Sequence, residues 1–139
     1  MAGNRSRTYR LTLSSEGTDL FLACHCRLAR IAKSFIPYGA TLSVALLLIS
    51  TMDTDELVAE LSMPSLKQLA GNDEHYVGAS TQLTPLAVAI LGRIENSGQI
   101  DARPTIGKLH VAAIAVMSAS EDRALARAYR QLSTAFPRN

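Results

Sequence analysis

An internal duplication limits the folds open to this sequence more than any other feature. An alternating stretch over residues 9–13, an apolar run over 44–49 and an acidic-led segment over 55–59 recur as residues 75–79, 111–116 and 121–125. The two copies are offset by 66 to 68 residues. Two copies are too few for a solenoid, whose units need neighbours on both sides. The duplication therefore predicts a pseudo-symmetric dimer written into one chain of 139 residues.

Each copy opens with a short segment that is typical of a strand. Residues 8–13 alternate with a period of two, which indicates a half-buried strand. Three side chains would face the core and three the solvent: Tyr9, Leu11 and Leu13 inward, and Thr8, Arg10 and Thr12 outward. Residues 75–80 form a weaker strand, because Gly78 has no side chain to pack. A lone short strand is unstable in water, so we expect the two copies to pair.

Helical patterns fill the rest of both copies. Apolar residues mark a first helix near residues 22–31 and again near 88–94. Residues 42–52 and 106–117 are apolar on almost every side, which predicts helices buried in a shared core. A trailing helix follows in each copy, over 53–61 and 123–136. The expected fold class is mostly α with a short two-stranded antiparallel β-ribbon, in a pseudo-two-fold tandem ribbon-helix-helix arrangement.

The same pattern divides the chain into segments. Residues 1–7 are expected to form a flexible basic arm, and residues 8–61 the first ribbon-helix-helix copy. Residues 62–74 would connect it to the second copy, residues 75–136. At this length the two copies are expected to share one core and form one compact domain.

Composition narrows the classes of function. The net charge is only +2, but the basic residues gather toward both ends of the chain and the acidic ones in its middle. No run reaches the roughly 18 apolar residues of a membrane span, and no apolar segment follows the basic N-terminus as in a secretory signal. We therefore expect a cytoplasmic protein.

No pattern of catalytic or metal-binding residues is present. The sequence lacks a phosphate-binding glycine-rich loop and a nucleophile elbow, so catalysis is not expected. Cys24-His25-Cys26 lacks the second ligand pair that a zinc site needs, and small helix residues are the better interpretation. We predict no cofactor and no metal.

Two segments resemble a known family. Residues 9–14 followed by a helix and then residues 39–45 are similar to the strand and helices of ribbon-helix-helix DNA-binding proteins. The tandem form, and residues 77–80, 85–86 and 102–109 in particular, resemble the single-chain double ribbon-helix-helix accessory proteins encoded by the virulence C operon of T-DNA-transferring plasmids. The resemblance covers residues 8–130. It implies a plasmid-encoded relaxosome accessory in conjugation or T-DNA processing, which binds double-stranded DNA near a transfer origin or border and helps a relaxase.

A two-stranded ribbon fits the major groove, where strand side chains can contact bases. Arg10 is the strongest candidate, because its planar guanidinium can bond guanine O6 and N7 together. The expected base-contacting residues are Thr8, Arg10, Thr12, Tyr76 and Ser80. Helix N-termini and basic side chains would contact phosphates, and the expected phosphate-contacting residues are Arg5, Arg7, Thr41, Thr105, Gly107 and Lys108. Because the two strands differ, the target site is expected to be asymmetric.

Other functions fit the same pattern. A transcriptional repressor or plasmid copy-control protein would use the same fold, because fold alone does not define function. A non-catalytic helical interaction module would instead use the acidic residues 53–60 as a partner surface. The conformation of residues 8–13 distinguishes DNA binding from the helical interaction module, since a strand there favours DNA binding. The chain is expected to act as a monomeric pseudo-dimer, with a relaxase or another transfer protein as a further partner and higher oligomers on DNA.

Overall fold

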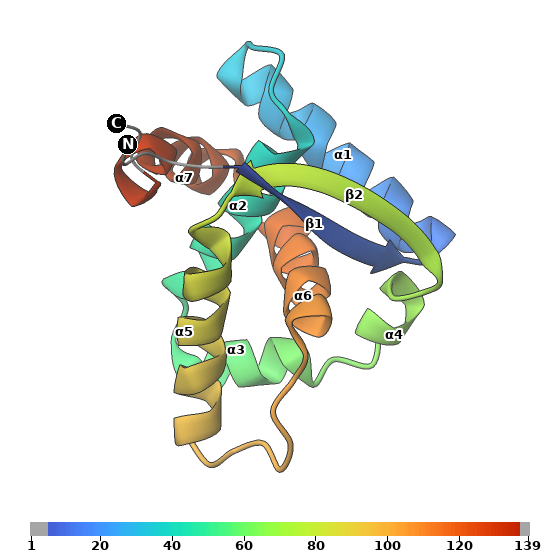
Figure 1. Cartoon of the computed structure of the whole chain (residues 1–139), viewed down its shortest axis with the longest axis vertical. Coiled ribbons are helices and arrows are strands. Elements are labelled where there is room, and N and C mark those ends of the chain that lie inside the picture. The colour runs from blue at the N-terminus through green and yellow to red at the C-terminus, as the bar shows by residue number, and fades with distance from the viewer. Residues whose placement is uncertain (1–5, 137–139) are drawn as a thin grey trace.

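A computed structural model describes residues 6–136 of the chain (Figure 1). The elements follow in the order β1 (Ser6–Leu13), α1 (Ser15–Ala32), α2 (Tyr38–Ser50), α3 (Thr54–Leu61), α4 (Leu66–Leu69), β2 (Asp73–Ser80), α5 (Leu83–Asn96), α6 (Ile106–Ala119) and α7 (Asp122–Ala135). The two strands pair antiparallel, in the only sheet of the described residues. The predicted fold class, mostly α with one two-stranded ribbon in a tandem ribbon-helix-helix arrangement, is confirmed.

The duplication is visible in the helix starts and in the strand register. The first residues of α1 and α5, of α2 and α6, and of α3 and α7 are each 68 positions apart. Tyr9 and Val77 are also 68 positions apart, and they lie directly opposite one another in the ladder. The pseudo-two-fold axis therefore passes through this pair, and Gly78 is the counterpart of Arg10.

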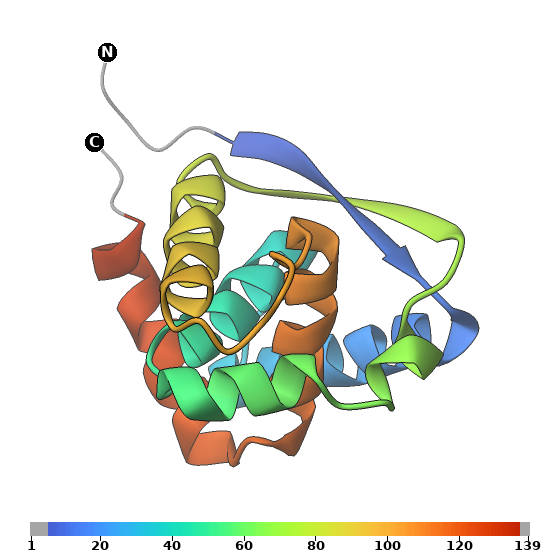
Figure 2. The same ribbon diagram turned by 90° about the horizontal axis from the view of Figure 1, so that it is seen from below.

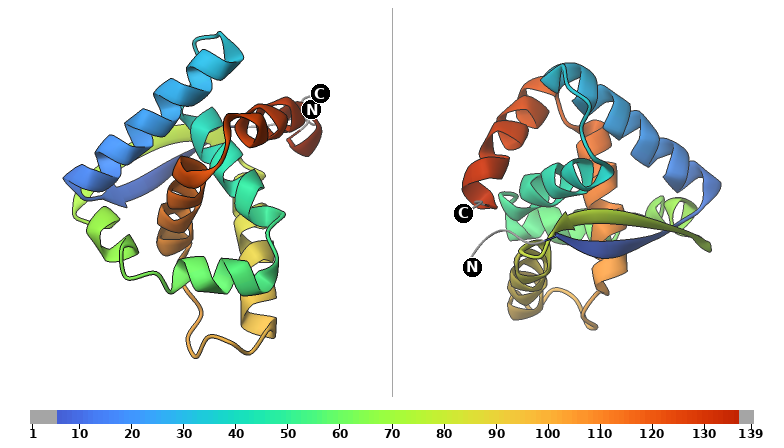
Figure 3. Two further views of the ribbon diagram at one scale, coloured as in Figure 1. Left: turned by 180° about the vertical axis from the view of Figure 1, so that it is seen from behind. Right: turned by 45° about the horizontal axis from the view of Figure 1, so that its top comes forward.

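The ribbon lies on one side of the helices (Figure 2). In the view from behind, the helices lie between the viewer and the ribbon (Figure 3, left). α2 and α6 pack against each other at the centre, and α1 contacts α6 while α5 contacts α2. The two copies are thus interlocked, because the first helix of each packs on the buried helix of the other.

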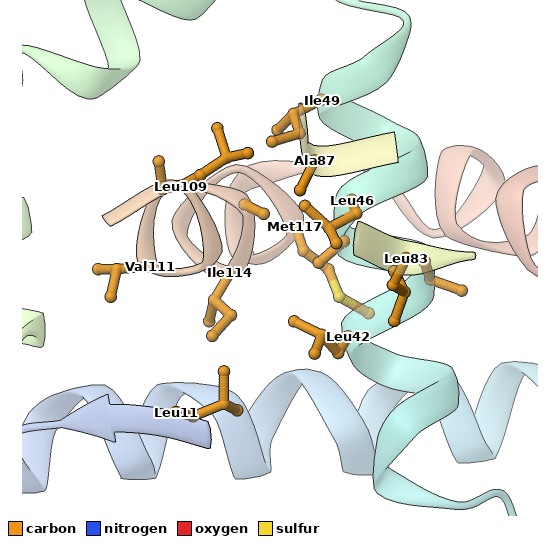
Figure 4. Close-up of a cluster of buried hydrophobic side chains, with 14 of the residues drawn as sticks. Leu11, Leu42, Leu46, Ile49, Leu83, Ala87, Leu109, Val111, Ile114 and Met117 are labelled. Carbon is orange, nitrogen blue, oxygen red and sulfur yellow. The ribbon is translucent and has the colours of Figure 1, made fainter. Parts of the chain in front are cut away.

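The core is built from the residues that the sequence patterns point inward. Side chains of α2, α5, α6 and β1 meet in one buried cluster (Figure 4). Leu11 of β1, Leu42 and Leu46 of α2, and Ile114 of α6 are each at most 2% exposed. Burying leucine-sized side chains contributes roughly 1.5–3 kcal/mol each, which is how the helices hold the ribbon in place.

Some predicted boundaries differ from the structure. Ser6 and Arg7 belong to β1 rather than to a flexible arm, and residues 1–5 lie outside the described residues. β2 begins at Asp73, inside the predicted connection, because the eight residues of β1 are matched by eight pairing partners. The connection itself contains the short helix α4.

Candidate nucleic-acid interface

The outer face of the ribbon is the candidate DNA-contacting surface. Tyr9, Leu11, Leu13, Val77 and Ala79 are buried against the helices, as the alternation predicts. The opposite face carries four cross-strand pairs: Ser6 with Ser80, Thr8 with Gly78, Arg10 with Tyr76, and Thr12 with Glu74. The predicted base-contacting residues are thus brought together on one side of two adjacent strands.

Arg10 is exposed on this face but has a partner there. Its Nη1 donates to Oε2 of Glu74 at 3.2 Å, and its side chain is 61% exposed. The hydroxyl of Tyr76 donates to the other carboxylate oxygen of Glu74 at 3.3 Å. An exposed ion pair contributes about 0–1 kcal/mol, so Arg10 can leave Glu74 at little cost.

Glu74 was not among the predicted site residues. The sequence pattern places it inside the predicted connection, residues 62–74, where strand alternation gives no signal. On the ribbon it lies beside the candidate base-contacting residues, and a carboxylate can accept from the N4 amino group of cytosine. Glu74 therefore sets the charge of this face as much as Arg10 does.

Ser80 and Arg7 lie at the same end of the ribbon, near the start of α5. Ser80 is half-buried, and its Oγ accepts from the backbone N–H of Gln82 at 3.0 Å. Arg7 is exposed, donates to Oγ1 of Thr84 at 3.3 Å and has its guanidinium 5.5 Å from the centre of the Tyr9 ring. Arg7 is held by the protein in this position and still presents its charge to solvent.

The N-terminus of α6 is open and suited to an anion. Thr105 caps the helix, and its Oγ1 accepts from the N–H of Lys108 at 3.1 Å. Among the described residues, no acceptor bonds the N–H groups of Ile106 and Gly107. Free N–H groups at a helix N-terminus attract anions, and the exposed Lys108 adds a full positive charge. Thr105, Gly107 and Lys108 are therefore placed together as the sequence predicts.

The N-terminus of α2 is closed, which corrects the prediction for Thr41. The helix begins at Tyr38 after Pro37, so Thr41 lies inside its first turns rather than at its cap. Its side chain is 0% exposed, and its Oγ1 lies 2.8 Å from Nδ1 of His25. Thr41 packs within the protein and cannot serve as a phosphate contact.

A close backbone contact explains why this end is closed. A Cβ built on Gly39 would lie 1.7 Å from the carbonyl oxygen of Gly78 in β2. Only glycine permits α2 to approach the ribbon so closely. At the equivalent Gly107, a Cβ would find its nearest neighbour 3.9 Å away, at Oγ1 of Thr105. The two helices thus share a glycine at their second position but have different surroundings there.

The opening beside β1 forms a groove of about 1010 Å³, bounded by β1, α4 and the first turn of α6. Four cationic side chains line it, and none of the described lining residues carries a carboxylate: the cations are Arg7, Arg10, Lys67 and Lys108. His110 also lines this groove. A concave surface with charge of one sign concentrates ligands of the opposite charge.

The sequence motif Cys24-His25-Cys26 does not converge on one point. Cys24 is buried, and burial raises the pKa of its thiol, whereas Cys26 is exposed. His25 faces Thr41, and burial lowers its pKa. Across residues 6–136, no group of three His, Cys, Asp or Glu side chains is placed to hold a metal ion.

No helix within the described part is both long and apolar enough to cross a membrane. The chain matches no protein-family model, no curated protein and no solved structure.

Proposed function

We propose that this protein binds double-stranded DNA sequence-specifically, with its β-ribbon in the major groove. One observation carries the proposal: the exposed face of a two-stranded ribbon presents Thr8, Arg10 and Thr12 beside the open, cationic N-terminus of α6. A two-stranded ribbon fits the width of the major groove, and the anion-attracting helix end would then lie beside the DNA backbone. The strand at residues 8–13 also favours this function over a helical interaction module.

The proposed target site is asymmetric. Arg10 has Gly78 as its counterpart across the pseudo-two-fold axis, so the described ribbon residues offer one guanidinium to the bases near the axis rather than two. The open helix end of α6 likewise has a closed counterpart in α2. A symmetric homodimer would prefer a palindrome, whereas this chain would contact the two half-sites differently.

By its resemblance to the double ribbon-helix-helix accessory proteins, we propose that the chain serves relaxase processing of a transfer origin or T-DNA border. Such processing is directional and suits an asymmetric site. The protein would bind and shape the DNA while the relaxase performs the cleavage. A repressor or copy-control protein is the alternative, with the same DNA-binding surface.

Fluorescence anisotropy of the full chain tests DNA binding, first on a random duplex pool and then on a site selected from it. We expect Arg10→Ala to weaken binding to the selected site by about 1–3 kcal/mol and to relax one base preference. Lys108→Ala should weaken binding to all sequences alike and reduce the salt dependence by about one phosphate contact.

Arg123→Ala is the matched control, because α7 begins on the side opposite the ribbon (Figure 2) and the Arg123 side chain is 81% exposed. Equal effects of Arg10→Ala and Arg123→Ala would refute the ribbon-in-groove proposal, as would a lack of binding at low salt. A nicking assay on the selected site then separates the two roles. Stimulated nicking supports the accessory role, and unchanged nicking with repression of an adjacent promoter supports the repressor.

A further inference from the structure

His110 occupies a position that the fold fills with leucine in the other copy. His110 of α6 and Leu42 of α2 are 68 positions apart, the same offset as their helices. Leu42 is 0% exposed and His110 is 3% exposed. Nδ1 of His110 has no hydrogen-bond partner among the described residues and is closed to solvent. Burying an unpaired polar atom is unfavourable, so packing alone gives no reason for histidine here.

The imidazole forms part of the wall of the groove beside β1. Burial lowers its pKa to about 4, so near neutral pH the ring is uncharged and can donate through one nitrogen and accept through the other. A ligand in the groove would meet the edge of the ring that lines it. DNA phosphates would stay at the rim, because a duplex cannot reach a side chain that is 3% exposed.

The rest of the groove suits a negatively charged molecule with an apolar part. Lys108 and the free N–H groups of Ile106 and Gly107 belong to its lining. Met63, Pro64 and Leu66 add apolar side chains to the lining. The groove volume of about 1010 Å³ is at the upper end of the roughly 300–1,000 Å³ that small-molecule sites occupy.

We propose that this groove binds a small organic anion. Its carboxylate or phosphate group would bond the N–H groups of Ile106 and Gly107 and pair with Lys108. Its apolar body would lie along Met63 and Pro64, and a polar group on that body would bond the ring of His110. The first copy has no such site, because Gly39 packs directly on β2. The proposal does not rest on DNA binding, although DNA would compete for Lys108.

Nuclear magnetic resonance titrations of the full chain test this site without DNA. The probes are phenyl phosphate and benzoate, which combine an anion with an apolar body and separate phosphate from carboxylate preference. Inorganic phosphate supplies the anion alone and benzyl alcohol the body alone. We expect phenyl phosphate or benzoate to shift the Ile106 and Gly107 amides and the His110 ring nitrogens saturably. The better of the two probes should bind about tenfold tighter than inorganic phosphate, whereas benzyl alcohol should shift none of these signals.

Variants and an internal reference make the result decisive. Lys108→Gln should weaken binding of the better probe by about tenfold, since it removes a charge-assisted contact. Arg123→Gln should leave it unchanged, and the Gly39 amide should not move. The proposal is overturned if inorganic phosphate binds as tightly as the organic anions. It is also overturned if Lys108→Gln has no effect, or if only duplex DNA shifts the Gly107 and His110 signals. The first two results leave DNA binding by the ribbon untouched, and the third would support DNA binding while overturning the small-anion site.

Discussion

We expect the substitution His110→Leu to raise the free energy of unfolding by about 1–2 kcal/mol at pH 7. The gain comes from removing Nδ1, a buried atom without a partner, whose desolvation costs about 1–3 kcal/mol. It is partly offset by the loss of an edge-to-face contact with the Tyr9 ring, whose centre lies 6.5 Å from that of His110. Leucine already occupies the equivalent position in α2, so the fold can accommodate it.

The stability difference between His110→Leu and the wild-type protein should increase at acidic pH. Burial lowers the pKa of His110 from 6.5 to about 4, so between these values the unfolded chain binds a proton that the folded protein does not. The wild-type protein therefore loses stability as the pH falls through this window, and His110→Leu does not. At pH 5 this proton-linked difference amounts to about 2 kcal/mol. Other titrating groups are shared by the two proteins and largely cancel in the comparison.

Urea denaturation followed by circular dichroism at pH 7 and pH 5 measures both effects. His75→Gln is the control for the loss of a histidine elsewhere, since His75 is exposed on the ribbon, where its Nε2 lies 3.1 Å from Oγ1 of Thr18. A variant less stable than wild type at pH 7 would refute the assignment of an unpaired imidazole. Parallel pH dependences of His110→Leu and wild type would refute the buried, neutral state of the ring.

Two further substitutions test the ribbon and its helix contacts. Gly39→Ala should destabilise the protein by about 3 kcal/mol or more, because the added Cβ would overlap the carbonyl oxygen of Gly78. Gly107→Ala should change the free energy of unfolding by less than about 1 kcal/mol in either direction. Equal losses of stability in thermal denaturation would contradict this difference. Glu74→Gln should alter the free energy of unfolding by less than about 0.5 kcal/mol, because the ion pair it removes is exposed. It should strengthen DNA binding in anisotropy titrations, because Arg10 is then free to contact DNA. Unchanged DNA affinity would show that Glu74 does not restrain Arg10.

The parts of the fold that sequence predicts are those with a clear period. Alternation over residues 8–13 correctly assigns the inward and outward faces of β1. The apolar runs correctly indicate α2 and α6 as the central helices, because side chains apolar on every side have no stable place but the core. Pairing of the two strands followed from the instability of a lone strand, and the structure confirms it.

The parts that sequence misses depend on contacts between distant residues. Asp73 and Glu74 have poor strand propensity, and only pairing with the far end of β1 makes them part of β2. Thr41 has the composition of a helix cap, but Pro37 starts the helix earlier and buries it. The unpaired state of His110 is also invisible in sequence, because it depends on what surrounds the ring.

Fusion of the two copies explains why such differences can persist. In a homodimer, any residue that closes one helix end closes the other, and any residue in one strand appears in both. In this chain Gly39 packs on the ribbon while its counterpart Gly107 stays open, and Arg10 faces a strand that has glycine at the equivalent position. His110 and Leu42 differ in the same way, although both lie in the buried helices. In each pair, one residue keeps a functional group or an open helix end. These residues all line the groove beside β1: Arg10, Gly107 and His110. A duplicated chain can thus keep one member of an equivalent pair for packing and use the other member, from either copy, to build a surface for binding.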